Sequence, residues 1–229
     1  MSEIQLAILW LMRFIPLFPF IVSIIKYKIF TIHLRIIAWY VFFGVIIQAI
    51  MTTLALQKIN NLFALHILAI EEFTMLSLFF SHVLKEIINK KIIYVLIALF
   101  TVFAVVNTIY FQPLTVYPTH TRILGAMIIM SYIFMNFYDR ARQSEPKKWS
   151  NNWSYKLNRI SYSFIFMGII MYHAGSVLLF SVSNEITYAK FPDLNTTIWT
   201  GHRVLIIIHY TFIGIGLLLF KRKKINWNE

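Results

Sequence analysis

The sequence predicts an all-α integral membrane protein, built as a bundle of seven transmembrane helices. Hydrophobic residues make up 59% of the chain, charged residues make up only 13%, and the mean hydropathy is +0.70. A soluble domain is only about half apolar, so the bilayer is the natural solvent for this chain. The 229 residues contain seven apolar segments, each long enough to cross a hydrocarbon core about 30 Å thick.

The segments follow one another with short connections and without internal repeats, which predicts a single domain over residues 1–229. The first segment is too long for a signal-peptide core and ends on a basic loop, so we expect it to remain as a helix. Pro16 and Pro19 lie within it and should kink it. The predicted spans are 4–25, 32–55, 62–84, 92–111, 122–139, 156–181 and 197–220.

Basic residues alternate between the two sides of the predicted bundle. Sixteen of the 21 flank the first, third and fifth connections or lie in the C-terminal tail. The positive-inside rule therefore predicts an outside N-terminus and a cytoplasmic C-terminus. This topology also accounts for the net charge of +12 without a nucleic-acid partner. The sixteen are Lys26, Lys28, Arg35, Lys85, Lys90, Lys91, Arg140, Arg142, Lys147, Lys148, Lys156, Arg159, Lys221, Arg222, Lys223 and Lys224.

Several chemistries are excluded by residues that the sequence lacks. The absence of cysteine rules out disulfides, thiolate metal sites and cysteine nucleophiles. A retinal protein needs a lysine inside its seventh span, and no span interior here contains one. Nucleophile motifs and glycine-rich phosphate loops are also absent, and no cofactor is predicted.

Two adjacent carboxylates lie in the middle of the third span, where a charge is costly and usually functional. These are Glu71 and Glu72, and counting along the helices places them at the same depth as Arg13 and His209. We favour Glu72 as the interior group because Ala69 lies one turn away and allows close helix approach. The sequence suggests that Glu72 pairs with Arg13. A purely structural tether is an equally open interpretation of such a pair.

Further polar residues lie nearer the predicted outer ends of the spans, which indicates an outward-facing pocket for a small ligand or proton. The candidate ligand-binding or proton-linked residues are Glu72, Glu71, Arg13, His66, His173, His202, His209, Gln48 and Trp199. His202 and His209 are seven residues apart and share one helix face. None of the seven histidines has a partner three or four residues away, so no metal site is predicted.

One resemblance rests on two parts of the sequence. The first runs from His66 to Phe73 and ends Ile-Glu-Glu-Phe, and the second contains Ile198, Trp199 and His202. The chain resembles small uncharacterised seven-helix proteins of bacterial inner membranes, some of which look like sensory or signalling partners. The resemblance implies a bacterial inner-membrane location and points to His66, Glu72, Trp199 and His202.

A weaker resemblance links residues 69–73 to membrane lycopene cyclases, which carry a Pro-x-Glu-Glu motif in the third helix. This chain has Ala69 where the motif has proline, and it lacks the second acidic motif of that family.

These observations favour a receptor-like or signalling-partner protein, with the lipid bilayer, a small apolar ligand and a signalling protein as its expected partners. The alternative is a membrane-embedded enzyme acting on a lipid or isoprenoid, either cyclase-like or a metal-dependent hydrolase. A transporter is less favoured, because the sequence shows no inverted repeat.

Overall fold

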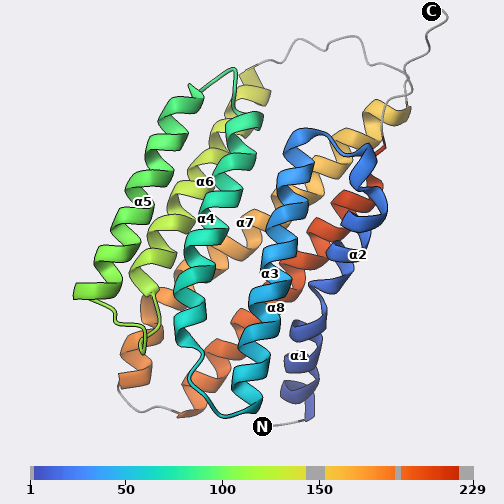
Figure 1. Cartoon of the computed structure of the whole chain (residues 1–229). Coiled ribbons are helices and arrows are strands. Elements are labelled where there is room, and N and C mark those ends of the chain that lie inside the picture. Colours follow the sequence, from blue (N-terminus) through green and yellow to red (C-terminus); the bar gives the residue numbers. More distant parts are fainter. Residues whose placement is uncertain (1–2, 143–152, 189–191, 222–229) are drawn as a thin grey trace, which may run out of the picture.

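The chain folds as a bundle of long helices in a computed structural model that describes residues 3–142, 153–188 and 192–221 (Figure 1). Within these residues seven helical stretches are long and apolar enough to cross a membrane, which confirms the predicted fold class. They are Glu3–Ile29, Ile32–Leu56, Leu62–Val83, Lys90–Tyr110, Thr119–Asp139, Leu157–Val182 and Asp193–Leu219. The helices are α1 (Glu3–Phe14), α2 (Leu17–Lys26), η1 (Tyr27–Ile29), α3 (Ile32–Leu56), α4 (Leu62–Val83), α5 (Lys90–Tyr110), α6 (Thr119–Arg142), α7 (Trp153–Tyr188) and α8 (Pro192–Leu219).

The first span is broken into α1 and α2, as its prolines predict. Pro16 occupies the N-cap of α2, and its carbonyl accepts a hydrogen bond from the Phe20 amide at 3.3 Å. A proline at this point has no N–H to continue α1. Pro19 lies in the first turn of α2, where a backbone N–H would lack an intrahelical partner in any case.

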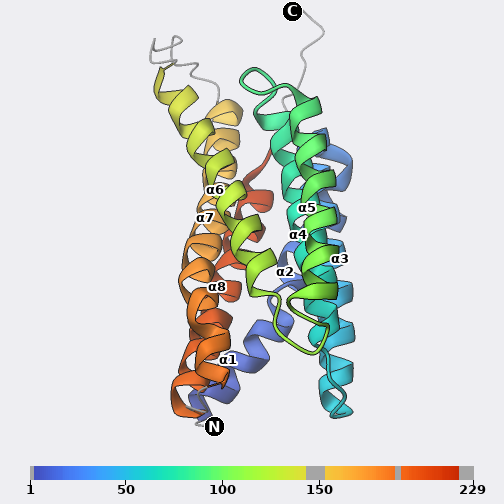
Figure 2. The same cartoon turned by 90° about the vertical axis from the view of Figure 1, so that its left-hand side faces the viewer.

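The helices form two layers (Figure 2). One layer contains α3, α4 and α5, and the other contains α6, α7 and α8. The broken first span packs along α8 and closes the bundle towards α3. We call the end where α1 begins the N-terminal end, which also holds the connections 57–61 and 111–118. The opposite end, where α8 finishes, is the C-terminal end (Figure 1).

Close packing of α7 on α8 depends on glycine. A Cβ atom placed on Gly216 would lie 2.8 Å from the Ser161 carbonyl oxygen, which is too close for a real side chain. The Ser161 hydroxyl donates a hydrogen bond to the Gly216 carbonyl at 2.6 Å. Small residues allow membrane helices to approach closely, and here they bring a polar bond within reach across the interface.

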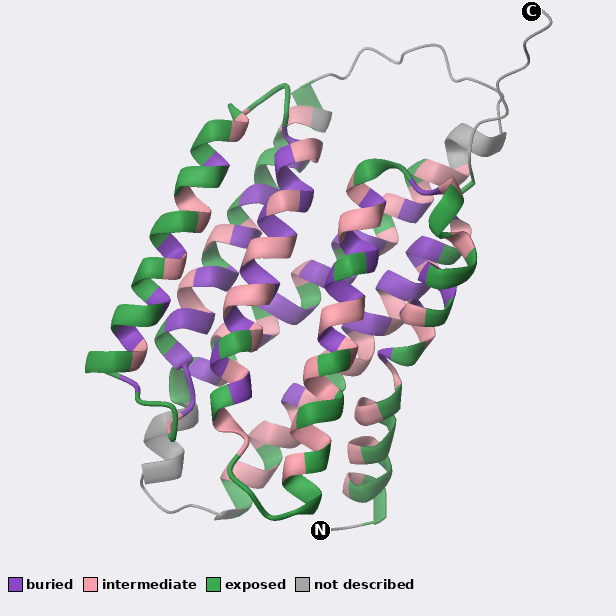
Figure 3. Cartoon of the chain, viewed as in Figure 1, coloured by how far each residue is buried: buried purple, intermediate pink, exposed green. Residues whose placement is uncertain are grey.

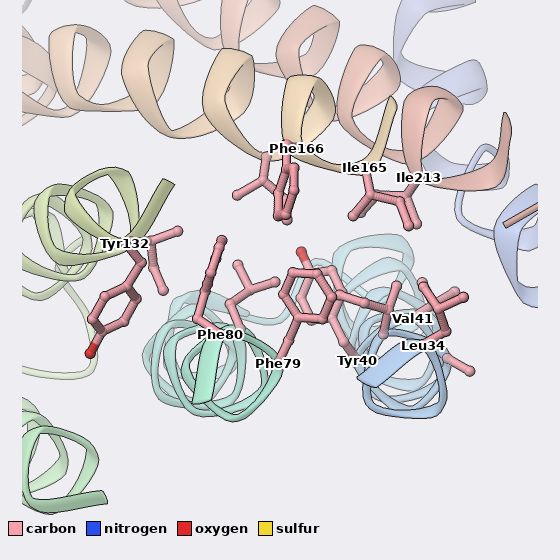
Figure 4. Close-up of a cluster of buried hydrophobic side chains, with 14 of the residues drawn as sticks. Leu34, Tyr40, Val41, Phe79, Phe80, Tyr132, Ile165, Phe166 and Ile213 are labelled. Atoms are coloured by element: carbon pink, nitrogen blue, oxygen red, sulfur yellow. The ribbon is translucent and has the colours of Figure 1, made fainter. Parts of the chain in front are cut away.

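A cluster of buried apolar side chains lies between the two layers (Figure 4). Phe79 and Phe80 of α4 meet Phe166 of α7, with ring centroids 6.0 and 5.9 Å apart. Other fully buried members include Leu34 and Val41 of α3. Since α3 begins and α4 finishes at the C-terminal end, this core fills that half of the bundle and leaves the other half for polar groups.

Large apolar side chains are exposed on the outside of the bundle, for example along α5 (Figure 3). Leu99 and Ile109 are 60% and 65% exposed. Such exposure would favour aggregation in water, but it is the arrangement that a lipid-facing helix requires.

Candidate functional site

A buried ion pair joins α4 to α6 inside the bundle. An Nη1 hydrogen of Arg122 is donated to Glu72 Oε2 at 2.8 Å, and the two side chains are only 4% and 9% exposed. The same Nη1 donates to the Tyr172 hydroxyl of α7 at 3.0 Å. Buried charges are tolerated when they are paired and hydrogen-bonded, so this contact allows Glu72 to occupy the bundle interior.

The expected pairing of Glu72 with Arg13 is wrong. Arg13 instead places its guanidinium over the Trp10 ring, 4.8 Å from the ring centroid. The predicted span 122–139 begins at Arg122, which places this residue at the end of a span by sequence. The structure brings this residue inward, since α6 begins at Thr119 and Arg122 lies in its first turn.

The connection 111–118 explains how Arg122 reaches Glu72. Its Gln112 is buried and accepts hydrogen bonds through Oε1 from the Asn107 side-chain amide and the His120 backbone N–H, at 3.0 and 3.1 Å. These bonds fold the connection back into the bundle and tie the start of α6 to the end of α5. The first turn of α6 is thereby held against α4.

His173 of α7 lies on the other side of the Glu72 carboxylate. Its Nδ1 must carry the proton, because the partner of Nδ1 is the Ile169 carbonyl at 2.8 Å and a carbonyl only accepts. Its Nε2 faces Glu72 Oε1 at 3.6 Å, which is too long for a hydrogen bond. Glu72 therefore uses one oxygen for Arg122 and keeps the other without a hydrogen bond within the described chain.

His209 of α8 is held by a second set of bonds. Its Nδ1–H donates to the Gly168 carbonyl of α7 at 3.0 Å. Its Nε2 then accepts from the hydroxyl of Tyr40 in α3 at 2.8 Å. The three helices are thus joined through one neutral imidazole with both nitrogens satisfied.

Glu72, Arg122, Tyr172, Tyr40 and His209 border a cavity of about 410 Å³ in the N-terminal half of the bundle. That volume lies within the range of roughly 300–1,000 Å³ that is typical of small-molecule sites. The wall combines charged, aromatic and aliphatic side chains from α1, α3, α4, α6, α7 and α8 and from two connections. Its residues are Leu9, Met12, Arg13, Tyr40, Gly44, Gln48, Met51, Thr52, Ala55, Asn61, Leu65, Leu68, Glu72, Tyr117, Arg122, Tyr172, Trp199, His202, Arg203, Ile206, His209 and Tyr210.

Four of these wall residues have a buried polar atom with no hydrogen-bond partner in the described part of the chain. The atoms are Glu72 Oε1, Arg122 Nε, His202 Nε2 and Arg203 Nη1. A buried polar group without a partner costs roughly 1–3 kcal/mol. Their residues border one cavity, which makes it the strongest candidate for a binding site in the bundle.

The structure brings six of the nine predicted site residues to this cavity, namely Glu72, Arg13, His202, His209, Gln48 and Trp199. The other three lie away from its wall. His173 is behind Glu72, and both Glu71 carboxyl oxygens are buried without a hydrogen bond in the described chain. His66 donates to the Val116 carbonyl at 2.9 Å and so fastens the connection 111–118.

Sequence reasoning missed Arg122 and the tyrosines at Tyr40, Tyr172 and Tyr210. Aromatic residues in a membrane span carry no sequence mark that separates a cavity wall from a lipid-facing surface. The one available signal was that Arg122 is a rare basic residue on the weakly basic side of the bundle.

Tyr117 contributes a neutral hydroxyl group at the edge of the cavity. It lies in the connection 111–118, outside the spans, and burial raises the pKa of its phenol to about 12. Its ring packs on Trp199 with 4.8 Å between centroids. Within the described residues, no group of three or more His, Asp or Glu side chains is placed to hold a metal ion.

Comparisons with protein-family models, with curated proteins and with solved structures find no match for this chain. The resemblances drawn from the sequence stay predictions.

Proposed function

We propose that this seven-helix membrane protein is a receptor-like protein that binds a small amphipathic ligand in the 410 Å³ cavity. The observation that carries the proposal is the convergence on one cavity of charged and polar side chains from several separate spans. A ligand that forms hydrogen bonds with these side chains would gain free energy that a purely apolar molecule cannot obtain.

The remaining wall suits the apolar part of such a ligand. Leu65, Leu68 and Ile206 supply aliphatic surface, and Trp199 and Tyr210 supply aromatic surface. Small-molecule sites are mostly apolar with a few polar groups that set orientation, and this wall has that composition.

The helix α8 offers a route from the cavity to the opposite end of the bundle. Trp199, His202 and His209 lie along its cavity-facing side, and the helix finishes close to the basic residues of the C-terminal end. There Lys26 donates hydrogen bonds to the carbonyls of Leu218 and Phe220. If α8 can take two positions, a ligand that binds more tightly to the protein with α8 in one of them shifts the population towards that position.

Under this proposal the cavity belongs to the outer half of a bacterial inner-membrane protein. The positive-inside rule supports that orientation, since the C-terminal end carries the basic connections. A membrane or cytoplasmic signalling protein would then read the position of α8 at the basic end.

Blocking the cavity tests the proposal directly. Leu68 lines the cavity, whereas the adjacent Ile67 is 54% exposed on the outside of the same helix. Leu68→Trp should fill the cavity, and Ile67→Trp should place the same indole in lipid. Binding of a panel of amphipathic small molecules is measured by thermal unfolding of the protein in lipid nanodiscs.

We expect at least one compound to stabilise the wild type and Ile67→Trp, and to leave Leu68→Trp unaffected. Equal stabilisation of both variants would place binding outside the cavity and contradict the proposal. A panel with no effect on the wild type would also count against it.

A further inference from the structure

We infer that the ligand carries an anionic head group, such as a carboxylate on an apolar tail, and that Arg13 and Arg203 bind this head from one side of the cavity. The inference rests on the proposed function and adds the chemical class of the ligand. Both arginines line the cavity, and their side chains come from the first and last spans.

The two arginines lie at the same depth. Arg13 follows Glu3, the first residue of its span, by ten positions, and Arg203 follows Asp193 by ten positions. Both spans begin at the N-terminal end, so each arginine is about 15 Å from that end at a rise of about 1.5 Å per residue. Because α1 packs against α8, the two guanidinium groups border the cavity at one level.

These positive charges are not neutralised by the described chain. Arg122 is paired with Glu72, but no described carboxylate lies within 4.0 Å of Arg13 or Arg203. Among the described residues, Arg13 is engaged only with the face of the Trp10 ring. Arg203 Nη1 is buried and makes no hydrogen bond with the described residues. Three guanidinium groups therefore border the cavity with a single carboxylate among them.

Charge and geometry both favour an anion at this position. Ionisable residues inside a membrane usually face a cavity and pair with an opposite charge. The planar guanidinium matches the two oxygens of a carboxylate, and the resulting charge-assisted hydrogen bonds are stronger than neutral ones. Beyond the arginines, Leu65, Leu68 and Ile206 provide the apolar surface that the tail of such a ligand would occupy.

A matched pair of probes separates the charge of the head from the binding of the tail. Octanoate and octanamide have the same chain and nearly the same shape, but only octanoate is charged at pH 7. Binding of each radiolabelled probe to the protein in neutral-lipid nanodiscs is measured by equilibrium dialysis, with empty nanodiscs as the reference for partition into lipid. We expect wild type to bind octanoate at least about tenfold more tightly than octanamide.

Removal of the charges should abolish this preference. We expect Arg203→Gln and the double variant Arg13→Gln with Arg203→Gln to lose about tenfold or more in octanoate affinity and to keep their octanamide affinity. The retained octanamide binding shows that the variants are folded. Arg203→Lys, which keeps the charge, should retain part of the preference. Lys58→Gln is the matched control, because Lys58 is a basic residue of the N-terminal end that lies outside the cavity wall.

The two proposals fail in different ways. Equal affinity for octanoate and octanamide in wild type would overturn the anionic head and leave the cavity as a binding site. An octanoate preference that persists in the double variant would place the anion elsewhere and also overturn the inference. Absence of saturable octanoate binding would overturn the inference, and the proposed function would still be judged by the Leu68→Trp and Ile67→Trp pair.

Discussion

Glu72 Oε2 accepts a hydrogen bond from Arg122 Nη1 at 2.8 Å, although the two residues lie 50 positions apart in the sequence. The contact joins α4 to α6 and forms part of the cavity wall. It also leaves Glu72 Oε1 and Arg122 Nε without a partner in the described chain. One ion pair thus ties two helices together and contributes two charged side chains to the cavity wall.

Removal of either member of this pair should destabilise the protein. Glu72→Gln leaves Arg122 as a buried charge without its counter-ion, and Arg122→Gln does the same to Glu72. We expect each single change to lower the free energy of unfolding by about 3–5 kcal/mol. The double change should be more stable than at least one of the single changes, because it strands no charge. Chemical unfolding in detergent micelles measures all three.

A suitable control for these variants is Glu86→Gln. Glu86 pairs with Lys85 at 3.4 Å, and their side chains are 76% and 61% exposed, so this pair contributes little. We expect a change close to zero. Strictly additive effects of the two buried substitutions would show that Glu72 and Arg122 are not energetically coupled.

The glycine contact between α7 and α8 yields a second prediction. In Gly216→Ala the new methyl group would lie 2.6 Å from Ile165 Cγ1 and 2.8 Å from the Ser161 carbonyl oxygen. We expect a loss of stability of about 1–3 kcal/mol, since one of the two helices must move. Thermal unfolding in nanodiscs detects such a loss.

Gly201→Ala on the same helix is the matched control. The nearest atom to a Cβ at Gly201 is Leu179 Cδ1 at 3.9 Å, an ordinary contact. Alanine favours a helix over glycine by up to about 1 kcal/mol, so this variant should be neutral or slightly more stable. If Gly216→Ala matched Gly201→Ala, the proposed close approach of α7 and α8 would be incorrect.

The hydrogen bond from Tyr40 to His209 should make a small and specific contribution. Tyr40→Phe removes the hydroxyl that His209 Nε2 accepts at 2.8 Å, while it keeps the ring. We expect a loss of about 0.6–1 kcal/mol in the free energy of unfolding, typical of interhelical bonds in membranes. Tyr94→Phe, at a tyrosine that is 47% exposed on α5, should have no measurable effect. A greater loss of unfolding free energy in Tyr94→Phe than in Tyr40→Phe would contradict the assigned hydrogen bond between Tyr40 and His209.

The orientation of the bundle is open to a clean labelling test, because the chain has no cysteine. Lys58 and Lys85 lie in exposed connections at opposite ends. A membrane-impermeant maleimide should label Lys58→Cys in intact bacterial cells and Lys85→Cys only after the membrane is permeabilised. The reverse pattern would invert the topology that the positive-inside rule predicts and would place the cavity on the cytoplasmic side.

The fold class was readable from the sequence, because each span must satisfy its own backbone hydrogen bonds within the bilayer. An apolar run of sufficient length therefore predicts a helix whatever its neighbours are. The break in the first span was also predictable, since Pro16 ends a helix through its own covalent structure. The same local reasoning singled out Glu71 and Glu72, because acidic residues are rare in an apolar span, and the nearby Ala69 favoured Glu72 as the interior group.

The partner of Glu72 was decided only by the tertiary structure. Depth along a helix follows from counting residues, but the direction in which a helix faces depends on its neighbours. Arg13 and Arg122 both lie in predicted spans. The folded connection 111–118 brings Arg122, and not Arg13, into contact with Glu72. The cavity likewise needed wall residues such as Tyr40 and Tyr172 from separate helices. Lipid-facing and interior positions of a membrane helix are equally apolar, so hydropathy cannot tell them apart, and only the packing of the helices does.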